Sequence, residues 1–186
     1  MRLNLPNTLT WLRILAIPLI VVLFYLPFSF SDPAAGLLFA AAAITDTLDG
    51  YLARRMGLTS RLGAFLDPVA DKLVVAVVLV LLVSKDPQPV VVLMAAIIIS
   101  REIAISALRE WMAELGQRTR VAVSSLGKWK TVLQMTGLAL MLYRQPLWGV
   151  PVYGLGLILA VIAAVLTLVS MVRYLQAAWP TLRDAN

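Results

Sequence analysis

The sequence contains no cysteine and no histidine. Without cysteine there is no disulfide, no thiolate nucleophile and no cysteine-ligated zinc site. Without histidine, the most common general base and the most common metal ligand are both missing. Acid–base or metal chemistry in this protein must therefore use carboxylates, of which the 186 residues supply only 10.

Charged residues are also scarce, at 14% of the chain, whereas hydrophobic residues reach 61%. Soluble domains average about 25% charged and about 45–50% apolar residues. A soluble globule of this size could not bury so much apolar surface, and several runs approach the ~20 residues that cross a bilayer. We predict an all-α, polytopic integral membrane protein that forms a single domain, residues 1–186.

Six apolar segments, separated by clusters of helix-breaking residues, predict six transmembrane helices behind a short interfacial segment at the N-terminus. Their expected bounds are Leu9–Phe28, Pro33–Arg54, Gly63–Val83, Pro89–Trp111, Ser125–Tyr143 and Val150–Leu175. Because Trp11 and Arg13 interrupt the start of the first run, we expect a retained helix rather than a cleaved signal peptide.

Basic residues exceed acidic ones, with 16 Lys and Arg and a net charge of +6. In a membrane protein this excess sets topology, and we expect no nucleic-acid partner. Only Lys85 and Arg144 fall in the turns on one side of the predicted membrane, whereas the other turns and both ends are rich in arginine and lysine. The asymmetry places both termini in the cytoplasm.

Four aspartates lie where the second and third segments meet. Asp46 and Asp49 are three residues apart and share a helix face, and Gly63, Asp67 and Asp71 recur every four residues on the next helix. A short turn joins the two segments, so the helices should be antiparallel neighbours. We therefore expect the aspartates to converge near the cytoplasmic boundary.

Carboxylates near hydrocarbon are costly, about 2.5–3.5 kcal/mol each at a helix centre, and four together repel one another. Divalent cations that prefer oxygen ligands, Mg²⁺, Mn²⁺ or Ca²⁺, would balance them, and paired ions of this kind recur in phosphoryl transfer. Gly50, Ala53 and Gly63 leave room for a ligand or let two backbones touch. The alternatives are buried salt bridges or the ion pathway of a transporter.

The spacing D-x2-D-G-x2-A-R-x8-G-x3-D-x3-D, from Asp46 to Asp71, resembles the signature of the CDP-alcohol phosphotransferase family. The resemblance implies a dimeric enzyme with six transmembrane helices, in which two divalent ions, Mg²⁺ or Mn²⁺, help an alcohol to displace CMP. It implies that Asp71 is the base that takes the alcohol's proton. The implied metal ligands are Asp46, Asp49, Asp67 and Asp71, and the implied cradle for the cytidine diphosphate is Gly50, Ala53, Arg54 and Gly63.

Further segments resemble the bacterial branch of this family that joins CDP-diacylglycerol to sn-glycerol 3-phosphate, giving phosphatidylglycerophosphate and CMP at the inner membrane. These segments are Leu5–Arg13, Phe65–Lys72, Ser100–Ile103, Ala107–Ala113 and Gly127–Thr131. Where the first helix enters the membrane, Asn7, Thr10 and Arg13 are candidate contacts for CDP-diacylglycerol, although Asn7 could simply cap the helix.

An acceptor that carries a phosphate needs cations beside the metals. The candidates are Arg101 and Arg109, two turns apart on the fourth segment, and Lys128, Lys130 and Thr131 at the start of the fifth. We expect the arginines to contribute more than the lysines, which are flexible and nearer water. The alternatives are pairing of the arginines with nearby glutamates, a topogenic role for the lysines and a helix-capping role for Thr131.

Two other functions stay open at this stage. One is the same family with another acceptor, such as inositol phosphate or serine. The other is a cation-coupled transporter that uses the same aspartates, although transporters often show inverted repeats with helices broken at the midplane, and this sequence shows no repeat. Metal-dependent release of CMP would separate the transferase from the transporter.

Overall fold

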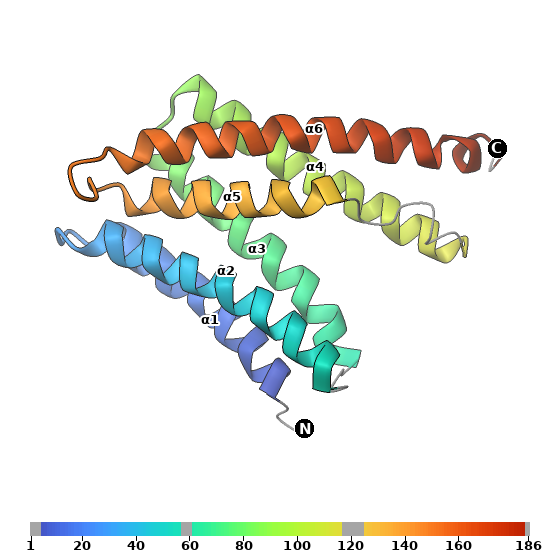
Figure 1. Cartoon of the computed structure of the whole chain (residues 1–186), viewed down its shortest axis with the longest axis horizontal. Helices are drawn as coiled ribbons and strands as arrows, with labels where there is room; N and C mark the ends of the chain where they lie inside the picture. Colours follow the sequence, from blue (N-terminus) through green and yellow to red (C-terminus); the bar gives the residue numbers. More distant parts are fainter. Residues whose placement is uncertain (1–4, 57–60, 117–124, 185–186) are drawn as a thin grey trace.

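The computed structural model describes residues 5–56, 61–116 and 125–184, with side chains for 10–46, 66–116, 129–176, Trp179 and Arg183. The described chain is all-helical, as predicted, and contains no strand (Figure 1). Its six helices are α1 (Leu5–Tyr25), α2 (Ser31–Met56), α3 (Arg61–Lys85), α4 (Pro89–Glu114), α5 (Ser125–Tyr143) and α6 (Val152–Asp184).

The helices follow the six predicted segments but differ from them at several ends. Helix α1 begins at Leu5, so the end of the predicted interfacial segment is part of the first helix. Helix α6 continues to Asp184, past the expected end at Leu175, because the next residues, Gln176, Ala177 and Ala178, are good helix formers. Its 33 residues exceed the ~20 that cross a bilayer, which leaves the last turns free to extend beyond the apolar layer.

The turns α1–α2, α3–α4 and α5–α6 gather at one end of the molecule (Figure 1). From there α1 and α2 run side by side, as do α5 and α6. Helix α2 also packs against α5, α3 against α1, and α4 against α6. Towards the opposite end, α1–α3 diverge from α4–α6 (Figure 1). The predicted aspartate region lies in this diverging half.

One apolar core joins all six helices. Its buried members include one from each helix in turn: Ile20, Phe39, Val78, Ile98, Leu138 and Ala160. The outer faces are apolar too, since every helix exposes large hydrophobic side chains, among them Leu15, Ile44, Val80, Leu93, Val132 and Ile158. Such an apolar exterior is unusual for a protein surrounded by water.

Polar side chains tie the three gathered turns together. The Lys85 ammonium lies 2.6 Å from an Asp32 carboxylate oxygen, which joins the start of α2 to the end of α3. The Tyr153 hydroxyl of α6 donates a hydrogen bond to Asp86. The Arg144 guanidinium lies 5.2 Å from the centre of the Tyr153 ring. We call these five residues the turn-end cluster.

Two helices, at Pro89–Glu114 and Val152–Gln176, are long and apolar enough to cross a membrane, and Thr10–Tyr25 forms a shorter apolar helix. The apolar sequence of α3 contains charged residues around Asp67, and that of α2 contains charged residues around Asp46. These are the helices that carry the aspartate motif.

Candidate active site

A buried arginine connects the first three helices at the aspartate motif. Arg13 of α1 is 3% exposed, and its Nη2 lies 2.8 Å from Oδ1 of Asp46 on α2. Its Nη1 donates a hydrogen bond to Oδ1 of Asp71 on α3, at 3.0 Å. One turn earlier on α1, the Thr10 hydroxyl donates to Oδ1 of Asp67, at 2.5 Å. The two aspartate-bearing faces therefore converge, as predicted, and α1 supplies the groups between them.

The spacing of the aspartates explains this arrangement. Asp67 and Asp71 are one turn apart on α3 and so face the same side. Thr10 and Arg13 are three residues apart on α1 and meet them in the same order. Each carboxylate on α3 thus has a donor at its own level on the facing helix.

Negative charge exceeds positive charge around Arg13. Arg13 contacts Asp46 at 2.8 Å and Asp71 at 3.0 Å, and Asp67 lies one turn before Asp71 on α3. One guanidinium cannot neutralise three carboxylates, whereas a divalent cation bound by oxygen ligands could. The donor set is therefore chemically suited to Mg²⁺ or Mn²⁺.

The carboxylates as they stand do not form a closed metal site. Among the side chains that the structure describes, no three acidic groups come together closely enough to hold a metal ion. Asp46 and Asp71 each direct an oxygen to Arg13 instead. The side chain of Asp49, the fourth expected ligand, lies outside the described residues.

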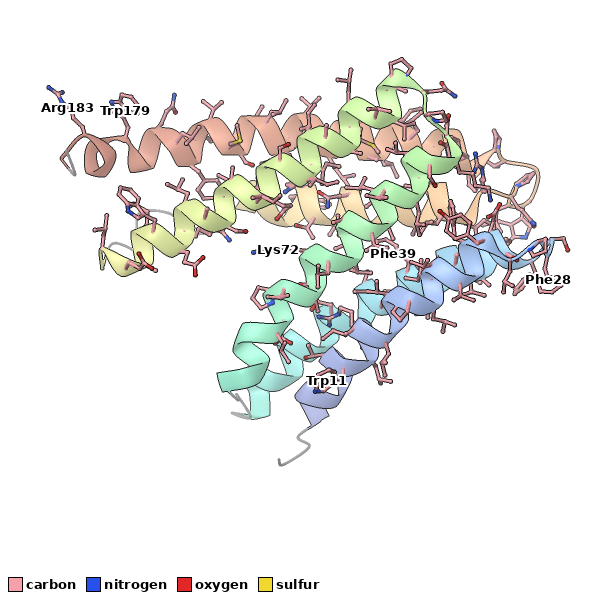
Figure 2. The ribbon with its side chains drawn as sticks, turned by 180° about the vertical axis from the view of Figure 1, so that it is seen from behind. Trp11, Phe28, Phe39, Lys72, Trp179 and Arg183 are labelled. Carbon is pink, nitrogen blue, oxygen red and sulfur yellow. The ribbon has the colours of Figure 1, made fainter. Side chains whose placement is uncertain are left out.

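A cavity of about 230 Å³ lies beside the aspartates, in the half of the molecule where the two helix groups diverge. Asp46 and Asp71 line one side of it. The remaining polar lining residues are Lys72, Glu102, Lys130, Thr131 and Gln134, contributed by α3, α4 and α5. Figure 2 shows the Lys72 side chain leaving α3 towards the space between the two helix groups. The cavity lining thus combines carboxylates with amino groups.

Lys130 is held in place by an ion pair on the far wall of the cavity. Its buried Nζ donates to Oε1 of Glu102 at 2.9 Å, and Nη1 of Arg101 donates to the same oxygen at 2.9 Å. Nη2 of Arg101 bonds the Ser170 hydroxyl of α6 at 3.1 Å. Arg101 pairs with a glutamate, as one of the sequence-based alternatives held, and is not among the residues that line the cavity.

Arg109 is not among the residues that line the cavity. Its Nη2 donates to the Tyr174 hydroxyl at 3.0 Å, and its guanidinium lies 5.3 Å from the centre of the Tyr174 ring. The structure therefore brings together Lys130 and Thr131 with the aspartates and separates Arg109 from them. Arg101 and Arg109 are two turns apart on α4, and both reach α6, at Ser170 and Tyr174.

Several predicted site residues cannot be compared with the structure in this way. Their backbones belong to α1, α2, α3 and α5, but their side chains lie outside the described residues: Asn7, Asp49, Gly50, Ala53, Arg54, Gly63 and Lys128.

Three polar residues of the cavity lining were missing from the predicted site. Lys72 follows Asp71 directly, Glu102 follows Arg101, and Gln134 lies one turn after Lys130. Helical spacing from Lys130 could have identified Gln134. Nothing in the sequence pattern separates Glu102 from the other glutamates of the fourth helix, because its role depends on a partner on α5.

Two apolar furrows flank helix α2 and end near the aspartates. One, of about 330 Å³, runs between α1 and α2 along Leu15, Leu19 and Ala41 and ends at Arg13 and Thr45. The other, of about 370 Å³, runs between α2 and α5 and includes Ala40, Ala43, Met135 and Thr131. The alanine run of α2 keeps both furrows open, because alanine carries a single methyl group.

Together these features define a helical site, set among apolar surfaces, that is suited to metal ions and anionic substrates. The chain matches the CDP-alcohol phosphatidyltransferase family over residues 3–172, and it belongs to that family. Family membership makes the chain an enzyme of the transferase type. Together with the two helices that are long and apolar enough to cross a membrane, it also makes the chain a membrane protein.

The chain is also similar over its whole length to curated bacterial enzymes. It is 52% identical over 184 residues to the CDP-diacylglycerol–glycerol-3-phosphate 3-phosphatidyltransferase of Salmonella choleraesuis (strain SC-B67). The enzymes of that name from Shigella flexneri serotype 5b (strain 8401) and Escherichia coli (strain K12) are equally similar. In each case the match covers 99% of this chain and 100% of the relative.

Proposed function

We propose that this chain transfers the phosphatidyl group of CDP-diacylglycerol to sn-glycerol 3-phosphate, forming phosphatidylglycerophosphate and CMP. The observation that carries the proposal is the 52% identity over 99% of the chain to enzymes of that name. The cavity between Asp71 and Lys130 supports it, since its lining combines carboxylates with the amino groups of Lys72 and Lys130.

In the reaction, a hydroxyl oxygen of the acceptor attacks the phosphorus atom that carries the diacylglycerol. The bond between that phosphorus and the bridging oxygen of CMP breaks, and CMP leaves. Asp71, which lines the cavity and reaches Arg13, takes the proton of the attacking hydroxyl. Arg13 is a positioning residue that holds this carboxylate through a hydrogen bond of 3.0 Å.

Two divalent ions, Mg²⁺ or Mn²⁺, would be held by Asp46, Asp49, Asp67 and Asp71. When bound, such ions neutralise the diphosphate and stabilise the leaving CMP. The pairing of Asp46 and Asp71 with Arg13 supports this role, because it keeps two close carboxylates stable until a second cation is present. The Thr10 hydroxyl orients Asp67 in the same way.

The CDP-diacylglycerol would be bound at the junction of α1, α2 and α3. We assign its diphosphate and nucleotide to Gly50, Ala53, Arg54, Gly63 and Asn7, with Thr10 and Arg13 acting through the aspartates. Its two acyl chains suit the two furrows beside α2, because both furrows are apolar and both end beside the aspartate site.

The acceptor brings about two further negative charges. We assign its phosphate first to Lys130 and Lys72, which line the cavity. Arg101 assists indirectly, because it donates to the same Glu102 oxygen as Lys130. Glu102 therefore keeps a cationic partner when Lys130 binds the phosphate. Thr131, which also lines the cavity, completes the proposed set together with Arg109 and Lys128.

The whole chain, residues 1–186, would form one domain with six transmembrane helices in the bacterial inner membrane, with both termini and the site on the cytoplasmic side. The apolar outer faces of all six helices support the six spans. The core shared by all six supports the single domain. We also expect a homodimer, on the family resemblance.

The test is release of labelled CMP from CDP-diacylglycerol by the purified full chain in detergent micelles. sn-Glycerol 3-phosphate should support rapid release, and glycerol, inositol phosphate and serine should be poor acceptors. Excess EDTA should abolish turnover, and Mg²⁺ or Mn²⁺ should restore it. Equal rates with inositol phosphate or serine would reject the acceptor, and full turnover in EDTA would reject the metal site.

A further inference from the structure

Gln134 is a buried polar residue on the cavity wall that the mechanism above does not use. It lies on α5, its side chain is 4% exposed, and it lines the cavity together with Asp71 and Lys130. Its carboxamide oxygen Oε1 is fully buried and accepts no hydrogen bond from any atom that the structure describes. A buried carbonyl oxygen without a donor is rare in folded proteins and costly.

The surroundings of Gln134 indicate what kind of group would satisfy it. The nearest cationic donor along the helix, Lys130, already donates to Glu102. Met135 and Val75, which also line the cavity, have no polar hydrogen to offer. A neutral donor that enters the cavity, such as an alcohol hydroxyl, is the group that this oxygen lacks.

The position of Gln134 relative to the other lining residues indicates which ligand group can reach it. Gln134 and Lys130 are four residues apart and lie on one face of α5, about 6 Å apart along the helix axis. Asp71 lines the same cavity from α3. A ligand with a reacting hydroxyl at Asp71 and an anionic group at Lys130 therefore presents its remaining polar group to the wall that carries Gln134.

We propose that Gln134 is a specificity-determining residue that accepts a hydrogen bond from the acceptor hydroxyl that does not react. The inference rests on the proposed function and deepens it: the substrate class becomes a small phosphate ester with two hydroxyl groups, of which Asp71 activates one and Gln134 binds the other. An acceptor that lacks the second hydroxyl leaves Oε1 unsatisfied.

The test compares sn-glycerol 3-phosphate with 3-hydroxypropyl phosphate, which lacks only the middle hydroxyl, in the CMP-release assay. The wild-type full chain should show a kcat/KM that is about 10-fold or more higher for glycerol 3-phosphate, the size expected for one buried hydrogen bond. This comparison needs no variant, so it remains decisive if a variant folds poorly.

The variant Gln134→Leu should lose that preference. Its kcat/KM for glycerol 3-phosphate should fall about 10-fold, while the value for 3-hydroxypropyl phosphate and the KM for CDP-diacylglycerol should stay near those of the wild type. The matched control is Thr167→Val, which removes a buried hydroxyl of α6 that does not line the cavity. It should keep the preference.

The inference is overturned if the wild type uses both acceptors equally, or if Gln134→Leu lowers both rates by the same factor, which is the signature of a purely structural role. These outcomes leave the proposed function intact, because CMP is still released with glycerol 3-phosphate. The absence of CMP release with every acceptor would instead reject the proposed function itself.

Discussion

At the scale of single residues, Asp71 has two proposed roles, as the general base and as a metal ligand. It lines the cavity and accepts a hydrogen bond from Arg13. Asp46 has the same neighbours but belongs to the other helix of the motif, and Asp67 is bonded to Thr10. The surroundings of the aspartates differ, so their substitutions should differ too.

The first prediction follows from that difference. Asp71→Asn removes the proton acceptor and should lower kcat by about 10²–10⁴-fold, with a much smaller change in KM for CDP-diacylglycerol. Asp46→Asn is the matched comparison and should also raise the concentration of Mg²⁺ needed for half-maximal rate. Steady-state kinetics over a range of Mg²⁺ concentrations measures both effects. Mild, equal losses at the two positions would contradict the separate roles.

The second prediction concerns the cations, where the structure changes the expected order. Lys130 lines the cavity, whereas Arg109 bonds Tyr174. Lys130→Ala should therefore raise KM for glycerol 3-phosphate roughly 10- to 100-fold, the value of one charge-assisted contact of about 1.5–3 kcal/mol. Arg109→Ala should raise it much less. A larger effect at Arg109 would restore the order expected from the sequence.

At the scale of helices, the contact between α5 and α6 depends on two glycines. A methyl group added at Gly137 would lie 2.8 Å from the backbone nitrogen of Ala160 and from the carbonyl oxygen of Gly156. A methyl group added at Gly156 would lie 2.7 Å from the carbonyl oxygen of Gly137. The backbones of α5 and α6 therefore touch at these glycines. This contact fixes the position of α5, and with it the positions of Lys130 and Gln134 on the cavity wall.

The third prediction tests that contact. Gly137→Ala places its methyl group against backbone that cannot move aside, and overpacking of this kind costs about 1–3 kcal/mol. The variant should melt at a lower temperature in detergent and lose activity at elevated temperature first. Gly154→Ala is the control, because no atom lies within 4 Å of its added methyl group. It should be neutral or slightly stabilising, and equal destabilisation of both variants would count against the contact.

At the scale of the whole molecule, the two ends of the bundle have different tasks. The turn-end cluster ties the three turns together through Asp32–Lys85 and Tyr153–Asp86. At the other end the helix groups diverge and leave the cavity between them. A bundle closed at one end and open at the other leaves the cavity accessible at its open end.

The fourth prediction tests that orientation and uses the absence of cysteine. A single cysteine introduced at Trp148, which is 94% exposed in the α5–α6 turn, should react with a membrane-impermeant maleimide in intact spheroplasts. One introduced at Leu115, at the end of α4, should react only after the membrane is permeabilised. The opposite labelling pattern would invert the proposed topology.

Much of the helical layout could be read from composition and spacing. Apolar runs with breakers between them predicted six helices, because helix formation in an apolar solvent depends mainly on local sequence. The i, i+3 spacing of Asp46 and Asp49 and the i, i+4 spacing of Asp67 and Asp71 predicted shared faces, because 3.6 residues per turn is a property of the backbone. The lack of histidine and cysteine left carboxylates as the catalytic groups.

The partners of these residues depended on how the helices pack. Arg13 reaches Asp71, 58 residues further along the chain, and Arg109 turns to Tyr174, 65 residues away. Spacing within one helix cannot report such pairs, because they depend on the rotation of each helix and on which neighbour it meets. Close contacts such as Gly137 with Gly156 set those rotations. For the same reason, the place of Gln134 on the cavity wall emerged only from the packed bundle, although its chemistry was visible in the sequence.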